Sequence, residues 1–197
     1  MLTVSPDPVV VESQLQAGEL ACPGCRGVVG PWGWARLRVL RYQDRVVGVR
    51  PRRGRCRRCG ATHVLLPATL LLRRADVAAL IGRGLLLGVV EGWACRRIAG
   101  VLGRPRSTVR GWLARFVERA ELLRAHFTRW ALWLESAWTR LEPQGTPAGD
   151  ALVALLAAGR AARARLGGVG VWSFASTATA GRLLCNTSAP FPAPWRG

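Results

Sequence analysis

Lysine is absent from this 197-residue chain, and all 29 basic residues are arginine. A GC-rich coding sequence accounts most simply for this composition, so the planar fork of arginine need not have been selected at each position. Acidic residues are also scarce, at 11 in the whole chain, and the formal net charge is +18. Such an excess of positive charge predicts a polyanionic partner, either nucleic acid or an acidic membrane surface.

Long apolar runs are missing too. A membrane-spanning helix needs ~20 consecutive apolar residues, and the most apolar region, 64–90, is interrupted by Arg73, Arg74, Asp76 and Arg83. The N-terminus lacks the charged and apolar regions of a secretory signal peptide. We therefore expect no membrane partner and a cytoplasmic, nucleoid-associated location. In a reducing cytosol, closely spaced cysteines indicate metal ligation rather than disulfide bonds.

Groups that could catalyse a reaction are few. The acidic residues after Phe116 are Glu118, Glu121, Glu135, Glu142 and Asp150. They fall on or beside predicted helices, whereas two-metal phosphoryl chemistry needs carboxylates that converge on one cleft. His63 and His126 are the only histidines, and neither forms a recognisable pair with a serine or cysteine nucleophile. We expect no enzymatic activity and no small-molecule substrate.

The cysteines carry the clearest chemical signal. Cys22 and Cys25 form one C-x2-C pair, Cys56 and Cys59 form another, and 30 residues separate the two pairs. A glycine follows shortly after each pair, which allows backbone amides to turn toward the sulfurs. Four thiolates without an open position are typical of a structural zinc site, so we expect Zn²⁺ here. His63 is interpreted as an ordinary strand residue.

The segment between the two cysteine pairs predicts short strands. Residues 34–42 largely alternate apolar residues with arginine, and 46–49 form a return strand after a turn at 43–44. Residues 62–66 supply a third strand. The region 21–70 is therefore predicted to be a three-stranded zinc ribbon, which is too small to be stable without metal binding worth about 10 kcal/mol.

Arginines crowd the second cysteine pair, and the expected DNA contacts among them are Arg52, Arg53, Arg55, Arg57 and Arg58. These side chains could bind phosphates. Alternatively, they could offset the local charge of about −2 on zinc with four thiolates. Their number exceeds what the zinc charge requires, so we favour phosphate contact.

Residues 91–116 have the spacing of two short helices joined by a tight turn. The residues expected to face the interior are Ile98, Ala99 and Leu102 in the first helix and Val109, Trp112 and Phe116 in the second. Gly103 can take the positive φ that the turn needs. Pro105 lies in the turn, and Ser107 is predicted to cap the second helix through its hydroxyl.

The start and outer face of the second helix form the predicted DNA-binding surface, which comprises Arg104, Arg106, Ser107, Thr108, Arg110, Gly111, Ala114 and Arg115. In helix-turn-helix proteins this face enters the major groove with its N-terminal end first. Arg110 could pair with a guanine edge, and Ser107 or Thr108 could reach a phosphate or base. Gly111 costs a helix about 1 kcal/mol. Close approach to DNA and a glycine-rich genome explain it equally well.

Apolar residues continue beyond Phe116 at steps of three and four residues as far as Trp138. This stripe predicts one long helix within a helix-turn-helix unit at 74–142. Either the later helix at 147–166 or a second copy of the protein would cover it, and the second alternative implies a homodimer. The remaining expected regions are a flexible arm at 1–20, a helical C-terminal region at 143–185 and an extended tail at 186–197.

The fold expected from these elements is mainly α with a small N-terminal β zinc ribbon, followed by a helix-turn-helix three-helix unit and a long helical extension. The segments that carry a family likeness are CPGC, RPRRGRCRRCGATHVLLP and RRIAGVLGRPRSTVRGWLARF. In this order they resemble the N-terminal DNA-binding half of bacterial insertion-sequence transposases, and short bacterial proteins related to them. The resemblance implies recognition of terminal repeats or an operator-like site. The ribonuclease-H-like domain of such transposases, with its acidic triad, has no counterpart here.

Three functions remain open from the sequence. The first is binding of double-stranded DNA, as a transcriptional regulator or a transposase-derived module. The second is a protein-interaction adaptor that uses the zinc ribbon and the tryptophan-rich helix. The third is a catalytically inactive transposase fragment. Charge alone does not separate DNA from RNA, although no stacking motif of an RNA-recognition sheet is present.

Overall fold

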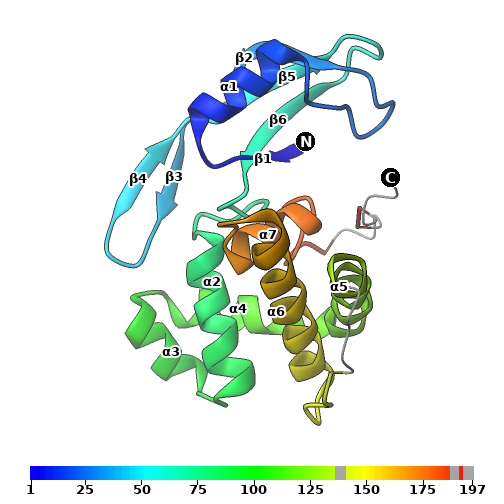
Figure 1. Ribbon diagram of the computed structural model, residues 1–197. Coiled ribbons are helices and arrows are strands. Elements are labelled where there is room, and N and C mark those ends of the chain that lie inside the picture. The colour runs from blue at the N-terminus through cyan, green and yellow to red at the C-terminus, as the bar shows by residue number, and fades with distance from the viewer. Residues whose placement is uncertain (136–140, 187–190, 193–197) are drawn as a thin grey trace.

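A β unit with one covering helix precedes a helical unit along the chain, and the two are stacked in space (Figure 1). The structure is a computed structural model that describes residues 1–135, 141–186 and 191–192. The β unit contains β1 (Leu2–Val4), α1 (Pro8–Ala17), β2 (Val29–Trp34), β3 (Arg38–Arg41), β4 (Val46–Val49), β5 (Arg52–Cys56) and β6 (Thr62–Pro67). The helical unit contains α2 (Ala78–Leu85), the π-helical segment η1 (Leu86–Val90), α3 (Cys95–Leu102), α4 (Arg106–Glu118), α5 (Ala120–Leu134), α6 (Pro147–Leu166) and α7 (Val171–Ala178).

The main sheet has four strands in the order β1-β6-β5-β2, and β3 and β4 form a separate hairpin. This differs from the three-stranded ribbon predicted from the sequence, because β2 and β5 were not expected. The sequence of β2 is VGPWGW and that of β5 is RRGRC. Glycine and proline disfavour strands, and β5 has no apolar alternation. The pairing of β2 with β5 depends instead on the two cysteine turns and on the helix that covers the sheet.

That covering helix is α1, so the prediction of a flexible arm at 1–20 is wrong. The Asp7 carboxylate caps α1 by accepting from the Val9 amide at 2.8 Å, and Gly18 ends the helix with φ +72°. Val11 and Leu15 lie one turn apart and are buried against Val29 and other residues of the sheet. Because these two apolar side chains need cover, the N-terminal segment folds onto the sheet.

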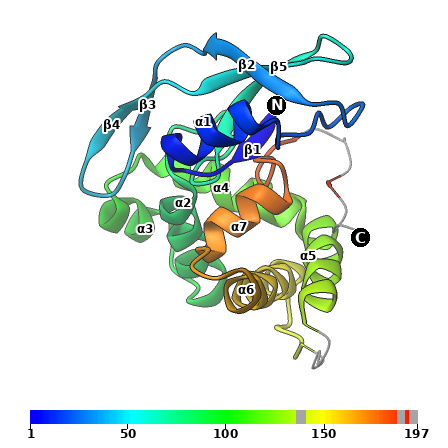
Figure 2. The ribbon, with the colours of Figure 1, turned by 45° about the horizontal axis from the view of Figure 1, so that its top comes forward.

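The predicted long helix is also wrong, because it is interrupted at Arg119, where φ is −108° and ψ is 8°. The break turns α5 so that it packs along α6 (Figures 1 and 2). The stripe predicted from Val109 onward is buried within the chain, with Phe127 and Trp130 on α5 in one core with Leu155 on α6. Of the two alternatives predicted for burying this apolar stripe, the later helix or a second copy of the protein, the structure shows the later helix, α6. Trp138 and most of the tail at 186–197 lie outside the described residues.

His126 on α5 is buried with 6% of its surface exposed, and its Nε2 lies 2.9 Å from the Ala178 carbonyl oxygen. Its pKa is lowered from 6.5 to about 4, chiefly by burial and in smaller part by the nearby Arg129 and Arg182, against the opposing effect of the hydrogen bond to Ala178. The fold therefore favours neutral His126. The contribution of neutral His126 to the stability of the fold is complete above pH 6.5. It is lost as the pH falls from 6.5 toward the pKa of His126 in the folded protein. We expect the loss to reach about 3 kcal/mol in the free energy of unfolding.

The measurement is urea unfolding between pH 7.5 and pH 4 for the wild type and for His126→Gln, which does not titrate. The free energy of unfolding should fall more steeply with acid in the wild type, because all other titrating groups are shared. Parallel curves for the two proteins would show that His126 does not carry this effect.

Candidate metal centre and nucleic-acid interface

The four cysteines come together at one end of the β unit. Cys22 and Cys25 lie in the turn before β2, and Cys56 and Cys59 lie at the end of β5 and in the turn that follows. All four sulfurs lie within 4.8 Å of one another. The Cys22–Cys59 sulfurs are 3.8 Å apart and the Cys25–Cys56 sulfurs 3.4 Å apart. Sulfurs bonded tetrahedrally to zinc at about 2.3 Å would be about 3.8 Å apart, so the cluster has the dimensions of a four-thiolate metal site.

Backbone amides prepare two of these thiols for metal binding. The amides of Cys25 and Gly24 lower the pKa of Cys22 to about 7. Those of Cys59 and Arg58 act in the same way on Cys56 and lower its pKa to about 6. The pKa of Cys25 is raised to about 12, because the neighbouring thiols outweigh the Gly27 amide, which acts to lower it. Four thiolates in one place require a cation, and the donor set fits a soft divalent metal.

His63 has a different role from the one predicted. It is buried on β6, and its Nε2 lies 3.4 Å from the Cys22 sulfur. Its Nδ1 lies 3.0 Å from the Met1 amino group. The imidazole is therefore neither a ligand in the described cluster nor an ordinary strand residue, since it contacts a candidate ligand from outside. Hydrogen bonds of this kind orient metal ligands. His63 follows Cys59 by four residues in the sequence. This short spacing was the available sequence signal for a contact with the cysteine cluster.

The arginines beside the second cysteine pair divide into two groups. Arg52 is held by Glu12 of α1, with Nε 2.8 Å from the carboxylate, and its guanidinium lies over the Trp34 ring. Arg53 is partly buried and donates to Thr62 Oγ1 at 3.3 Å. Both were predicted to contact DNA, which stays a prediction, and both make contacts within the β unit. Sequence alone could not separate them from their neighbours, because α1 was not expected there.

The second group is exposed and comprises Arg55, Arg57 and Arg58. Arg55 lies over the ring of Trp32, 4.6 Å from its centroid, and Arg58 donates to the Cys25 carbonyl at 3.3 Å. Arg55 and Arg57 border a shallow hollow over Gly30 and Trp32. Positive charge is therefore concentrated around this hollow and the adjacent cysteine turn. These three arginines fit both interpretations given above, phosphate contact and compensation of the thiolate charge.

The helix-turn-helix is formed by α3, the turn at 103–105 and α4. Gly103 ends α3 with φ +61°, as predicted. All six residues expected in the interior are buried: Ile98, Ala99, Leu102, Val109, Trp112 and Phe116. α2 packs behind both helices, and a Cβ added at Gly84 of α2 would lie 3.2 Å from the Trp112 ring. The three-helix unit predicted from the apolar spacing is confirmed.

The cap of α4 differs from the prediction. The helix begins at Arg106, and its N-cap is Pro105, without a side-chain cap. The Pro105 carbonyl accepts from the Thr108 amide at 3.0 Å and from the Val109 amide at 3.2 Å. Proline has a fixed φ that suits this position. The Ser107 hydroxyl is consequently not needed as a cap, and it stands exposed in the first turn.

Along α4, the side chains of Arg106, Ser107, Arg110 and Ala114 are exposed, and those of Thr108, Gly111 and Arg115 are half-buried. This exposed surface lies opposite the buried side of α4, as predicted. A Cβ added at Gly111 would meet nothing within 4 Å. Packing within the protein therefore does not require this glycine, and both earlier explanations remain.

Arg104, which was predicted to contact DNA, makes contacts inside the protein. Its Nε lies 2.5 Å from the Asp76 carboxylate, and its Nη2 donates to the Tyr42 carbonyl at 2.5 Å. The two charged side chains are only 10% and 6% exposed. Arg104 therefore joins the turn before α4 to the β3–β4 hairpin. No sequence signal indicated this, because Tyr42, Asp76 and Arg104 are far apart in the chain.

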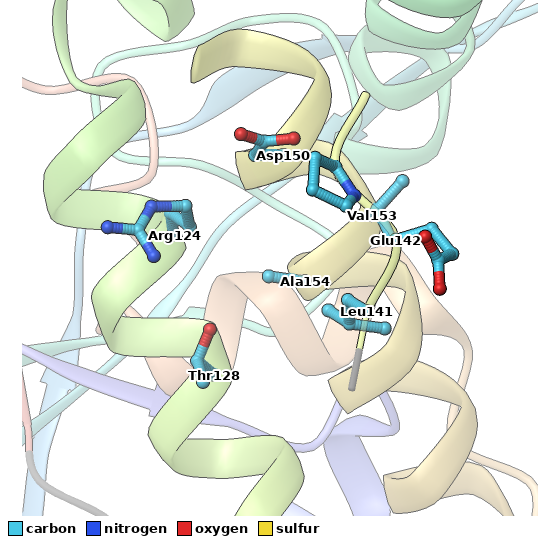
Figure 3. Close-up of a pocket in the computed structure, with 8 residues that line it drawn as sticks. Arg124, Thr128, Leu141, Glu142, Asp150, Val153 and Ala154 are labelled. Carbon is cyan, nitrogen blue, oxygen red and sulfur yellow. The ribbon is translucent and has the colours of Figure 1, made fainter. Parts of the chain in front are cut away.

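A second hollow lies between α5 and the start of α6 (Figure 3). Its labelled lining includes Arg124, Thr128, Glu142 and Asp150. Arg124 is paired with Glu121 at 2.8 Å, and Asp150 accepts from the Gln144 amide at 2.6 Å. Local contacts thus account for the charged groups here. Among residues 1–135, 141–186 and 191–192, the four cysteines are the one His/Cys/Asp/Glu group arranged to hold a metal ion.

Residues 68–124 match a family described as a homeodomain-like domain, which is found in transposases. The match runs from the end of the β unit through α2, α3 and α4 into α5. No curated protein and no solved structure matches the chain. Within the described part of the chain, no helix has the length and apolar character needed to cross a membrane.

Proposed function

We propose that this protein binds double-stranded DNA by inserting the N-terminal end of α4 into the major groove. The observation that carries the proposal is the geometry of α4. Its buried residues hold it against α2 and α3, and Arg106, Ser107 and Arg110 stand exposed in its first turns. A rigid helix with exposed arginine at its N-terminal end suits base recognition. The match of 68–124 to a homeodomain-like domain supports this function.

Within this proposal, the four cysteines bind a structural zinc ion. Cys22, Cys25, Cys56 and Cys59 would supply all four ligands, so the metal would cross-link the turns before β2 and after β5 without an open coordination position. Arg55, Arg57 and Arg58 would contact phosphates, because they are exposed and make no ion pair in the described residues. The protein would act by binding alone. The acidic residues Glu121 and Asp150 are already engaged in local contacts.

The proposal includes two biological versions, a transcriptional regulator and a transposase-derived module. The likeness of 68–124 to a domain found in transposases favours the second. Duplexes selected from a random pool by the zinc-loaded protein would separate the versions. Enrichment of sequences from the ends of a mobile element supports the transposase-derived module, whereas enrichment of a site upstream of a gene supports the regulator.

Arg110→Ala is expected to weaken binding to the selected duplex by about 1–3 kcal/mol and to relax preference at one base pair. The reason is that Arg110 would pair bidentately with a guanine edge. Titration of wild type and variant against selected and random duplexes measures the effect. Arg129→Ala, which removes an exposed arginine from α5, is the matched control. An equal loss for Arg110→Ala on both duplexes would contradict base reading by Arg110.

The affinity for the selected duplex is also expected to fall steeply with salt. If Arg55, Arg57, Arg58 and Arg106 each neutralise one phosphate, they should contribute about −3.6 to the slope of log affinity against log salt. Binding measured between 50 and 300 mM salt gives this slope. A slope near zero would mean that these arginines do not contact phosphates.

A further inference from the structure

The β3–β4 hairpin is attached to the helical unit rather than to the main sheet. Backbone bonds join it to the segment before α2: the Arg41 amide donates to the Ala75 carbonyl at 2.8 Å, and the Val77 amide donates to the Arg41 carbonyl at 3.2 Å. Leu40 is 2% exposed and belongs to the helical core. The hairpin therefore has a fixed position relative to the helix-turn-helix.

The tip of the hairpin lies beside the start of α4. Arg104, two residues before α4 begins, donates to the Tyr42 carbonyl and pairs with Asp76. Arg83 of α2 donates to Gln43 Oε1 at the tip, at 2.5 Å. Figures 1 and 2 both place the hairpin next to α3 and the turn that precedes α4. This end of α4 is the end proposed to enter the major groove.

The hairpin and its flanks are basic and largely unpaired. Residues 36–50 contain Arg36, Arg38, Arg41, Arg45 and Arg50 against a single acidic residue, Asp44. In the described residues none of these arginine side chains forms an ion pair. Arg41 and Arg45 are exposed, and Arg45 lies over the Tyr42 ring, 5.0 Å from its centroid. Both are thus available to an external anion.

One face of the hairpin is largely uncovered by the residues that the structure describes. Leu40 of β3 and Val49 of β4 pack against the helical core. Residues that alternate with these along each strand face outward, and Val39 is 56% exposed and Val46 67% exposed. Leu37, just before β3, is 66% exposed. On this face, exposed aliphatic side chains lie between arginines. The arginines suit the phosphates of a groove wall, and the aliphatic side chains suit its sugars.

We propose that the β3–β4 hairpin is a second DNA-contacting element that binds the duplex beside the site of α4. This rests on the proposed function of α4. When the N-terminal end of α4 occupies the major groove, the hairpin tip beside it reaches the flanking sugar–phosphate backbone. Its four-residue strands span about 13 Å, which corresponds to about 4 base pairs of the flanking duplex at about 3.4 Å per base pair. Charge complementarity selects DNA as the occupant of this face.

The proposal assigns Arg104 a positioning role. The guanidinium holds Asp76 and the Tyr42 carbonyl at once, so it fixes the hairpin tip relative to the first turn of α4. The spacing between the base-reading helix and the flanking contact is set by this bridge. The exposed Arg41 and Arg45 then supply the charge.

The test uses the full-length zinc-loaded protein, a selected duplex and hydroxyl-radical footprinting. The double variant Arg41→Ala/Arg45→Ala removes two exposed side chains. The backbone hydrogen bonds of both residues remain. The matched control is Arg129→Ala/Arg160→Ala, which removes two exposed arginines from α5 and α6. We expect the hairpin variant to bind about 10-fold to 50-fold more weakly, with a salt slope smaller by about 2. Its footprint should be shorter by about 4 base pairs on one side, and its base preference at the α4 site should be unchanged.

Trimming the duplex provides a second readout. Removing the flank on the hairpin side should weaken wild-type binding and leave the hairpin variant unaffected. If the wild type binds no duplex, the proposed function of α4 fails. If the wild type binds but the hairpin variant matches it in affinity and footprint, α4 still reads DNA and the hairpin proposal is overturned. The hairpin proposal would also be overturned if the hairpin variant altered only the self-association of the protein. The hairpin would then contact a second copy of the protein and not DNA.

Discussion

Removal of the metal, or replacement of Cys56 by serine, is expected to unfold the β unit while the helical unit stays folded. Most of the β unit packs in a core separate from the helical one, although Leu40 of β3 and Leu66 of β6 belong to the helical core. The core of the β unit contains few buried residues, and two of them, Cys22 and Cys56, are candidate metal ligands. So small a core does not stabilise a sheet by itself, whereas a structural zinc site contributes about 10 kcal/mol or more. The helical core is several times larger and contains no candidate ligand.

Zinc content, circular dichroism and limited proteolysis together measure this outcome. Purified protein should carry one zinc ion per chain, and Cys56→Ser should lose most of it. Proteases should then cleave between α1 and β6 while the helical signal persists. Cys95→Ser is the matched control, because Cys95 lies at the start of α3, away from the cluster, and it should retain the metal. Full zinc content in Cys56→Ser would disprove the four-cysteine site.

Replacement of Trp112 by alanine is expected to lower the free energy of unfolding by about 3–5 kcal/mol. Trp112 is 1% exposed, and its ring packs against Gly84 of α2 and Leu102 of α3. Truncation would leave a cavity where the three helices meet. Because small domains are stable by only about 5–15 kcal/mol, such a loss would leave α4 poorly held and would abolish specific DNA binding.

Urea unfolding followed by circular dichroism measures the change. Trp133→Ala serves as the control, because Trp133 lies on α5 with 42% of its surface exposed, and its loss should cost much less. If Trp112→Ala and Trp133→Ala lowered stability equally, Trp112 would not be the central packing residue of the helix-turn-helix.

The helix-turn-helix and the cysteine cluster are predictable from the sequence because both depend on short-range spacing. Apolar residues three and four positions apart identified the buried faces of α3 and α4, and Gly103 identified the turn. The two C-x2-C pairs identified the four cysteines of the candidate metal site without knowledge of the strands between them. In each case the signal lies within a few residues of the structure that it predicts.

The features that sequence reasoning missed depend on contacts between distant segments. Nothing near Arg104 indicates that its guanidinium would bind Asp76 and the Tyr42 carbonyl. Likewise, the break at Arg119 follows from the packing of α5 along α6, whereas the local apolar stripe continues without interruption. Arg52 reads as one more surface cation until α1 places Glu12 beside it. These residues show that contacts within the protein engage some of the arginines predicted to contact DNA.

Recognition of the major groove by Arg110 is tested most directly by a binding measurement. Wild type and Arg110→Ala are titrated against selected duplexes in which single guanines are replaced by 7-deazaguanine. This base lacks the N7 acceptor in the major groove and keeps normal pairing. We expect the wild type to lose about 1–3 kcal/mol of binding free energy when one particular guanine is replaced. The affinity of Arg110→Ala should not change with replacement of the same guanine. Equal binding of the wild type to every substituted duplex, or the same loss in the variant, would contradict recognition of the major groove by Arg110 of α4.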